Sequence, residues 1–84
     1  MAKTYSAVTT ATASNIAFQI EVSNVGTISL ERSINGTKWV TDRSVEDMFV
    51  FSNVAEFNVQ GVVVGQKPRF VYENCTEVSF TVLQ

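Results

Sequence analysis

The sequence has no histidine and a single cysteine, Cys75, among its 84 residues. Histidine is the commonest acid or base near neutral pH and the commonest metal ligand, so its absence removes most routes to a catalytic or metal centre. One cysteine excludes a disulfide within the chain and leaves either an intermolecular bridge or a buried or half-buried thiol, of which we expect the thiol. We therefore expect no enzymatic activity, no cofactor and no bound metal.

Carboxylates are the remaining groups that could act in acid–base catalysis or bind a metal ion. Glu46, Asp47 and Glu56 are the nearest candidates for an acid and base pair. Asp42, Glu46 and Asp47 could offer oxygens to Ca²⁺, but they lack the Asp-x-Asp-x-Asp-Gly spacing of a loop that wraps this ion. The four glycines stand apart, so no glycine-rich phosphate loop is present. We interpret the carboxylates as a solvated loop and strand surface.

Charge of either sign is sparse. Six basic and eight acidic residues give a formal charge of −2, and the longest run of acidic residues is the pair Glu46-Asp47. Nucleic-acid binding requires clustered Lys and Arg, so we expect neither a nucleic-acid partner nor an anionic membrane surface. The N-terminal MAKTYSAVTTATAS lacks the apolar run of a secretory signal, and no stretch approaches the roughly 20 apolar residues of a membrane span. We expect synthesis and folding in a cytoplasm.

The chain length predicts one domain, residues 1–84. A domain of this size buries only about 60 to 65% of the surface that its unfolded chain exposes, so its own core is marginal. Small domains are commonly stabilised by disulfides, metals or partner subunits. Since the first two are missing, we expect a homo-oligomer, with a trimer as one candidate.

Apolar residues repeat at every second position, as is typical of β-strands. In residues 16–22, for example, Ile16, Phe18, Ile20 and Val22 share one face. The pattern predicts an all-β protein, an antiparallel β-sandwich or small barrel of seven or eight short strands. Residues 1–14 are expected to form either a weak first strand or an arm that orders on a partner. The only segment compatible with a short helical turn is 42–48, where Ser44 would be the cap.

The stretch ERSINGTKWV, Glu31 to Val40, contains the strongest turn signal. An Asn-Gly pair between extended runs predicts a two-residue type I′ turn. With Asn35 and Gly36 as the loop, Arg32 faces Trp39, and its guanidinium is expected to cover the indole. The alternative is a tryptophan platform for a sugar or a base. We favour the structural interpretation, because Trp39 has no aromatic neighbours at strand spacing.

This hairpin also carries a resemblance. GTISLERSINGTKWV resembles a G-T-V-x-L-x-R-S-x-D/N-G-x-x-W hairpin of small bacteriophage and prophage proteins, and PRFVYENCTEVSFTVLQ is similar to their final strands, Y-R-F/V-x-C and V-x-V-x-L-x-Q. The match covers about residues 16–43 and 67–84, and departs from the pattern in a turn with one glycine and in the centre from 44 to 65. The matching residues are Gly26, Leu30, Arg32, Ser33, Gly36, Trp39, Arg69, Phe70, Cys75, Val82, Leu83 and Gln84.

The resemblance implies a virion-associated β-sandwich protein similar to capsid decoration or cement proteins, with no catalytic residues. We expect the chain to act in the virion as a symmetric oligomer that buries surface between capsomers, with the major capsid protein or other virion proteins as partners. One alternative is a tail, fibre or baseplate module that binds host glycan, with Trp39, Tyr72 and Tyr5 stacking on the sugar. Another is a phage-encoded regulator or inhibitor of a host protein that acts through a strand edge.

The predicted interface lies in the N-terminal segment from Ala2 to Ser14. This segment is rich in small residues, which have little use unless they pack on a partner. The first interface residues are expected to be Ala2, Lys3, Thr4, Tyr5, Ser6, Ala7 and Val8.

Overall fold

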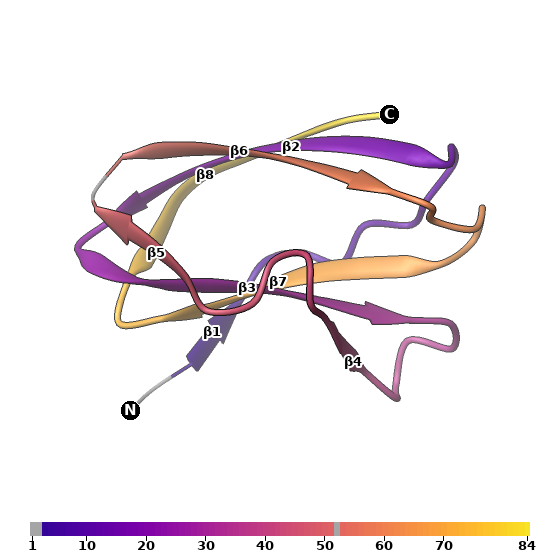
Figure 1. Ribbon diagram of the computed structural model, residues 1–84, viewed down its shortest axis with the longest axis horizontal. Helices are drawn as coiled ribbons and strands as arrows, with labels where there is room; N and C mark the ends of the chain where they lie inside the picture. The colour runs from indigo at the N-terminus through magenta and orange to yellow at the C-terminus, as the bar shows by residue number, and fades with distance from the viewer. Residues whose placement is uncertain (1–2, 52) are drawn as a thin grey trace.

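The computed structural model describes residues 3–51 and 53–84, in which eight β-strands and no helix occur (Figure 1). None of these residues belongs to a helix long and apolar enough to cross a membrane. The strands are β1 (Lys3–Tyr5), β2 (Asn15–Ser23), β3 (Val25–Ser33), β4 (Val40–Asp42), β5 (Met48–Phe51), β6 (Val54–Gln60), β7 (Lys67–Glu73) and β8 (Thr76–Leu83).

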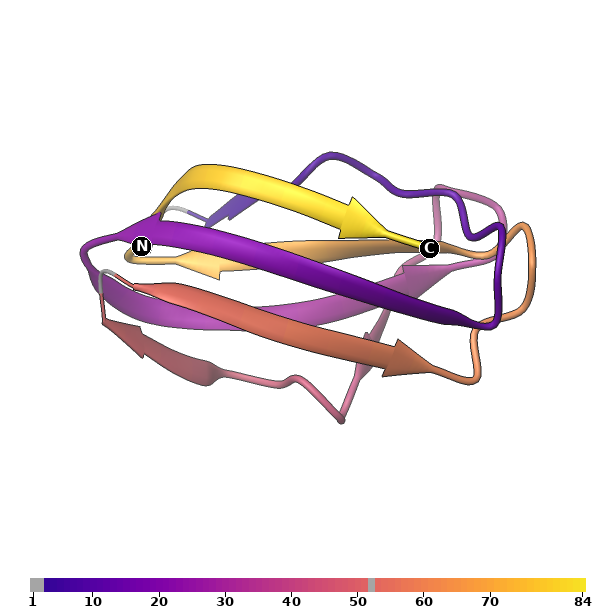
Figure 2. The same ribbon diagram turned by 90° about the horizontal axis from the view of Figure 1, so that it is seen from above.

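The strands form two antiparallel sheets that pack face to face (Figures 1 and 2). The five-stranded sheet has the order β1-β7-β3-β4, with β5 also paired to β3, and the three-stranded sheet has the order β6-β2-β8. The prediction of an all-β antiparallel protein is confirmed, and of the two predicted architectures, a sandwich or a small barrel, the structure has the sandwich.

The core lies between the two sheets and follows the alternating pattern of the sequence. On β2, the predicted face of Ile16, Phe18, Ile20 and Val22 is buried. Aromatic rings fill the centre, where Phe18 meets Phe70 edge to face with 4.8 Å between the ring centroids. The buried apolar residues form one continuous cluster, to which both sheets contribute.

Several pairs of consecutive strands belong to different sheets. The connections between strands gather at two opposite ends of the sandwich (Figure 1). We call the end with the connections 34–39 and 61–66 the loop end. The opposite end has the tight turns around Asn24, Asn53 and Asn74, and we call it the turn end. At two of these turns the asparagine has positive φ, 71° at Asn24 and 67° at Asn74, which asparagine tolerates better than most residues.

The N-terminal segment is ordered on its own chain. Lys3, Thr4 and Tyr5 pair with the second half of β7, which confirms the weak first strand. Beyond β1, the backbone N–H groups of Thr9 and Ala11 donate to the carbonyls of Pro68 and Gln66. Residues 3–11 therefore lie along β7 of their own chain.

The predicted two-residue turn at Asn35-Gly36 is wrong. β3 pairs with β4 through Leu30 and Asp42, Glu31 and Thr41, and Arg32 and Val40, so the register differs by one residue and the loop spans 34–39. A type I′ turn needs positive φ at both central residues, and only Gly36 has it, at 82°. Side chains stabilise the wider loop instead.

Asn35 is the centre of that loop. Its Oδ1 accepts hydrogen bonds from the backbone N–H groups of Thr37 and Lys38, both at 2.9 Å. The Ser33 hydroxyl donates to the same oxygen and accepts from the Gly36 N–H. Such local hydrogen bonds compete with a hairpin ladder, which explains why Trp39 lies in the loop and outside β4.

The helical turn considered for residues 42–48 is also wrong. This segment forms bends and turns, because Val45 is buried in the core and its carbonyl accepts a hydrogen bond of 2.7 Å from the N–H of Leu30. Asp47 then adopts a positive φ of 51°, which a helical turn does not allow.

Candidate functional site at the loop end

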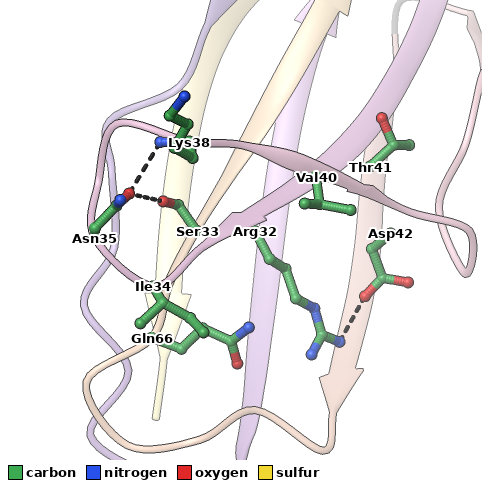
Figure 3. Close-up of a pocket in the computed structure, with 9 residues that line it drawn as sticks. All are labelled: Arg32, Ser33, Ile34, Asn35, Lys38, Val40, Thr41, Asp42 and Gln66. Carbon is green, nitrogen blue, oxygen red and sulfur yellow. Dashed lines mark hydrogen bonds and ion pairs between the residues drawn. The ribbon is translucent and has the colours of Figure 1, made fainter.

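A pocket of about 500 Å³ opens at the loop end, between the β3–β4 hairpin and the β6–β7 loop (Figure 3). Its lining residues combine aliphatic, amide and charged groups. They are Arg32, Ser33, Ile34, Asn35, Lys38, Val40, Thr41, Asp42 and Gln66.

Arg32 lies in the middle of this pocket because it continues the inward face of β3 past Ile28 and Leu30 (Figure 3). Its Nη2 donates to Asp42 Oδ2 at 2.5 Å and to the carbonyl oxygen of Gln60 at 3.1 Å. The second of these bonds joins the two sheets. Arg32 Nε is buried and has no hydrogen-bond partner, so both of these contacts are made by Nη2.

Asp42 neutralises the charge of Arg32 in the pocket. Burial alone would raise the pKa of this carboxyl, but hydrogen bonds from Ser44 and the charge of Arg32 outweigh it and hold the pKa below its usual range. The Ser44 N–H donates to Asp42 Oδ1 at 2.9 Å. The pair is therefore ionised at neutral pH and leaves Arg32 no spare charge for an anionic ligand.

Aliphatic side chains surround the pocket and extend past it. Ile34 also lines a neighbouring hollow of about 290 Å³ in the β6–β7 loop, so the two depressions are continuous around this residue. We define the apolar rim as four side chains that are each 66 to 83% exposed: Ile34, Val40, Val63 and Val64. Contiguous exposed apolar surface of this kind commonly marks a site of interaction.

Trp39 is covered by a different arginine from the predicted one. Arg32 faces Val40 and pairs with Asp42, whereas the guanidinium of Arg69 lies 4.0 Å from the centroid of the Trp39 ring. The same guanidinium lies 4.2 Å from the centroid of the Tyr5 ring. The prediction that Arg32 covers Trp39 is therefore wrong, because it depended on the two-residue turn.

Glu31 holds Arg69 in place between the two rings. Its Oε1 accepts from Arg69 Nε at 2.9 Å and pairs with Nη2 at 2.8 Å. Tyr5 comes from β1, Arg69 from β7 and Trp39 from the β3–β4 loop, so the stack forms only when these three segments assemble. Tyr5 remains half exposed.

Tyr72, the other predicted stacking residue, belongs to the core. Its side chain is 1% exposed, and its hydroxyl donates to Glu77 Oε1 at 2.6 Å. Burial, together with this hydrogen bond and the charge of Glu77, raises the pKa of Tyr72 well above its ordinary value. A sugar or base has no access to this ring, so its assignment as a stacking residue is wrong.

The catalytic and metal candidates are brought together only in part. Glu46 and Asp47 line one hollow of about 210 Å³, where Asp47 exchanges hydrogen bonds with Ser29, whereas Asp42 lines the pocket at the loop end and Glu56 lies on β6 in the other sheet. Among residues 3–51 and 53–84, no group of three or more His, Cys, Asp or Glu is placed to hold a metal ion. Cys75 is buried and burial raises its pKa, so it is a buried thiol as expected.

The predicted N-terminal interface residues divide into exposed and inward-facing side chains. Lys3, Thr4, Ala7 and the half-exposed Tyr5 and Val8 face solvent, whereas Ser6 is buried against Phe70. Ala2 lies outside the described residues. It remains a prediction that the exposed residues of this segment contact another protein. Ser6 instead holds the segment against β7 through its hydrogen bond with Phe70.

The apolar rim was not predicted from the sequence. Two signals were present: Ile34 directly precedes an Asn-Gly pair, and Val62, Val63 and Val64 follow Gly61 at the end of a predicted strand. Large aliphatic residues are uncommon in turns.

No family model matches the chain, and the searches of curated proteins and of solved structures also give no match.

Proposed function

We propose that this chain is a structural protein of a bacteriophage virion, a capsid decoration or cement protein that acts by burying surface on its neighbours. The observation that carries the proposal is the apolar rim, because a protein of 84 residues has little reason to expose four aliphatic side chains at one end unless a partner covers them. The virion setting rests on the resemblance of the hairpin and of the last strands.

The two segments of that resemblance lie side by side in the fold. Residues 16–43 include β2 and β3, residues 67–84 include β7 and β8, and β3 pairs with β7 from Thr27–Glu73 to Ser33–Lys67. β2 pairs with β8 in the other sheet. The matched segments therefore include the central strands β2, β3 and β7 and the edge strands β4 and β8, while the 44–65 segment, which departs from the motif, supplies β5, β6 and half of the apolar rim.

A cement protein of this shape would insert its loop end at a junction between capsomers. Burial of apolar surface contributes about 25 cal/mol per Å², so the four rim side chains would supply several kcal/mol of association energy. Lys38 beside the rim would favour an acidic surface on the capsid.

Co-sedimentation with emptied capsids tests the proposal. We expect the wild-type protein to sediment with capsids of the phage that encodes it, and the variant Val63→Asp to bind at least 10-fold more weakly. Leu83→Asp is the matched control, because Leu83 is as exposed as Val63 but lies on the outer face of the three-stranded sheet. Wild-type protein that does not bind capsids contradicts the proposal.

A tail or fibre module that binds host glycan is the second candidate. The observation that favours it is the stack of Tyr5, Arg69 and Trp39, which presents two aromatic rings at the surface of the five-stranded sheet. A glycan array comparing the wild-type protein with Trp39→Ala separates the candidates. Sugar binding that is lost in the variant supports the glycan module, and the absence of sugar binding excludes it.

A further inference from the structure

Exposed apolar side chains occupy the turn end of the sandwich as well as the loop end. Phe49 and Phe51 are 57 and 60% exposed, and their rings meet edge to face with 4.6 Å between the centroids. Val25, which faces Phe51 on β3, is also half exposed. We call these three residues the aromatic end. These three side chains project from the outer face of the five-stranded sheet near the turn end, because Gly26 and Val50 beside them are buried, whereas the apolar rim lies at the loop end, at the other end of the long axis (Figure 1).

We propose that copies of this chain associate end to end, with the apolar rim of one copy seated on the aromatic end of the next. This inference rests on the proposed function for its virion setting and deepens it by naming a second copy as a partner of the loop end. A loop end that is seated on another copy is not available to the capsid, so in a row of copies only the terminal loop end inserts between capsomers. Exposed aromatic side chains that insert among aliphatic ones are typical of the residues that dominate interface energies.

The charges of the two ends are complementary. Lys38 and Lys67 flank the loop end, and neither is in an ion pair, since the ion pairs within residues 3–51 and 53–84 are Arg32–Asp42 and Arg69–Glu31. Lys38 lines the pocket, and the side chain of Lys67 lies beside Gly36 in the 34–39 loop. The loop end therefore carries positive charge without an acidic partner.

The turn end carries the opposite sign. Glu73 lies opposite Thr27 near the end of β7, Glu77 lies near the start of β8, and Glu21 lies near the end of β2. Lys3 faces Glu73 across β1 and β7 and offsets one of these charges. Contact between a loop end and a turn end thus brings opposite charges together, whereas contact between two identical ends brings like charges together and is disfavoured.

A contact between two different surfaces is heterologous. It closes into a ring when the rotation between neighbours allows it, and otherwise it extends as a filament.

The single chain is already compact, since its accessible surface of 4970 Å² matches the roughly 5,000 Å² typical of a folded monomer of this mass. A standard interface of about 800 Å² on each partner would cover roughly a sixth of that surface, so variants that lose the contact should remain folded monomers.

Two single variants test this arrangement on the purified protein. Ile34→Asp blocks the loop end and keeps the turn end intact, whereas Phe51→Asp does the reverse. In sedimentation velocity, the wild-type mass should rise with concentration above 9.3 kDa, and each variant alone should remain a monomer. An equimolar mixture should form a dimer that does not grow further, because the intact loop end of Phe51→Asp binds the intact turn end of Ile34→Asp and both remaining free ends carry a substitution.

Leu83→Asp is the matched control and should associate like the wild-type protein. Circular dichroism and thermal unfolding establish that each variant is folded. A wild-type protein that stays monomeric at millimolar concentration overturns the proposal, and so does Phe51→Asp that still dimerises alone, since that result indicates contact between identical ends. These measurements use no capsids, so end-to-end association and capsid binding can fail independently of each other.

Discussion

The guanidinium carbon of Arg69 lies 4.0 Å from the centroid of the Trp39 ring, and Trp39 is thereby fixed to β7 even though it lies in the loop before β4. The opposite neighbour of the guanidinium is the ring of Tyr5, at 4.2 Å. An arginine between two aromatic rings ties the N-terminal strand, the centre of the sheet and the β3–β4 loop together. This stack therefore stabilises the face of the five-stranded sheet whether or not a ligand binds there.

A double-mutant cycle measures the Arg69–Trp39 contact. Arg69→Ala and Trp39→Ala should show a coupling energy of about 0.5 to 1 kcal/mol in urea unfolding, which is the usual range for a cation–π contact near the surface. The same cycle with Arg32→Ala should give a coupling near zero, because Arg32 pairs with Asp42. A larger coupling for Arg32 than for Arg69 would show that the register derived from a two-residue turn is the correct one.

Ser6→Ala is expected to destabilise the protein by about 1 to 3 kcal/mol. The Ser6 hydroxyl accepts a hydrogen bond of 2.9 Å from the N–H of Phe70, and a buried donor without a partner costs about that much. Chemical denaturation of Ser6→Ala and of Thr10→Ala, whose side chain is exposed, measures the difference. Equal stabilities of the two variants would mean that the N-terminal segment is not docked on β7 as described.

Gly26→Ala should be among the most damaging single substitutions, at about 3 kcal/mol or more. A Cβ at this position would overlap the carbonyl oxygen of Glu73 and approach the backbone nitrogen of Cys75 to 2.8 Å, and backbone atoms cannot move aside as a side chain can. Gly61→Ala is the control, since its Cβ meets open space and only its positive φ of 72° opposes the change. Thermal unfolding of the two variants should rank them in this order.

The protein should lose stability in alkaline solution. Burial raises the pKa of Tyr72 above its ordinary value of 10.0, so the folded state retains a proton that the unfolded state releases. The stabilisation is complete below about pH 10 and declines above it by about 1.4 kcal/mol per pH unit. Burial also raises the pKa of Cys75, whose contribution has the same sign and begins near pH 9.

Unfolding in urea at pH 8 to 11 separates the two contributions. Tyr72→Phe should remove the steeper decline above pH 10, and Cys75→Ala should remove the part that begins at lower pH. A wild-type stability that is flat up to pH 11 would contradict the burial of both groups.

The alternating pattern was sufficient to predict the fold class and much of the core. The predicted face of β2 is buried as expected, and Phe70 and Tyr72, two residues apart on β7, are buried as well. Strand periodicity is local, and one buried face per strand is enough to specify it. The pattern does not say how a partly exposed run is oriented, and on β5 it is Val50 that is buried while Phe49 and Phe51 face solvent.

The residues alone were enough to predict an all-β antiparallel fold, as a sandwich or a small barrel, and to exclude histidine chemistry and a disulfide within the chain. The register of the β3–β4 hairpin, the partner of Trp39 and the gathering of Ile34, Val40, Val63 and Val64 at one end became known only from the folded structure. These features depend on residues that are distant in the sequence, such as Arg69 with Trp39 or Ile34 with Val64. Their placement follows from loop hydrogen bonds and strand pairing that involve the whole chain, which no local pattern contains.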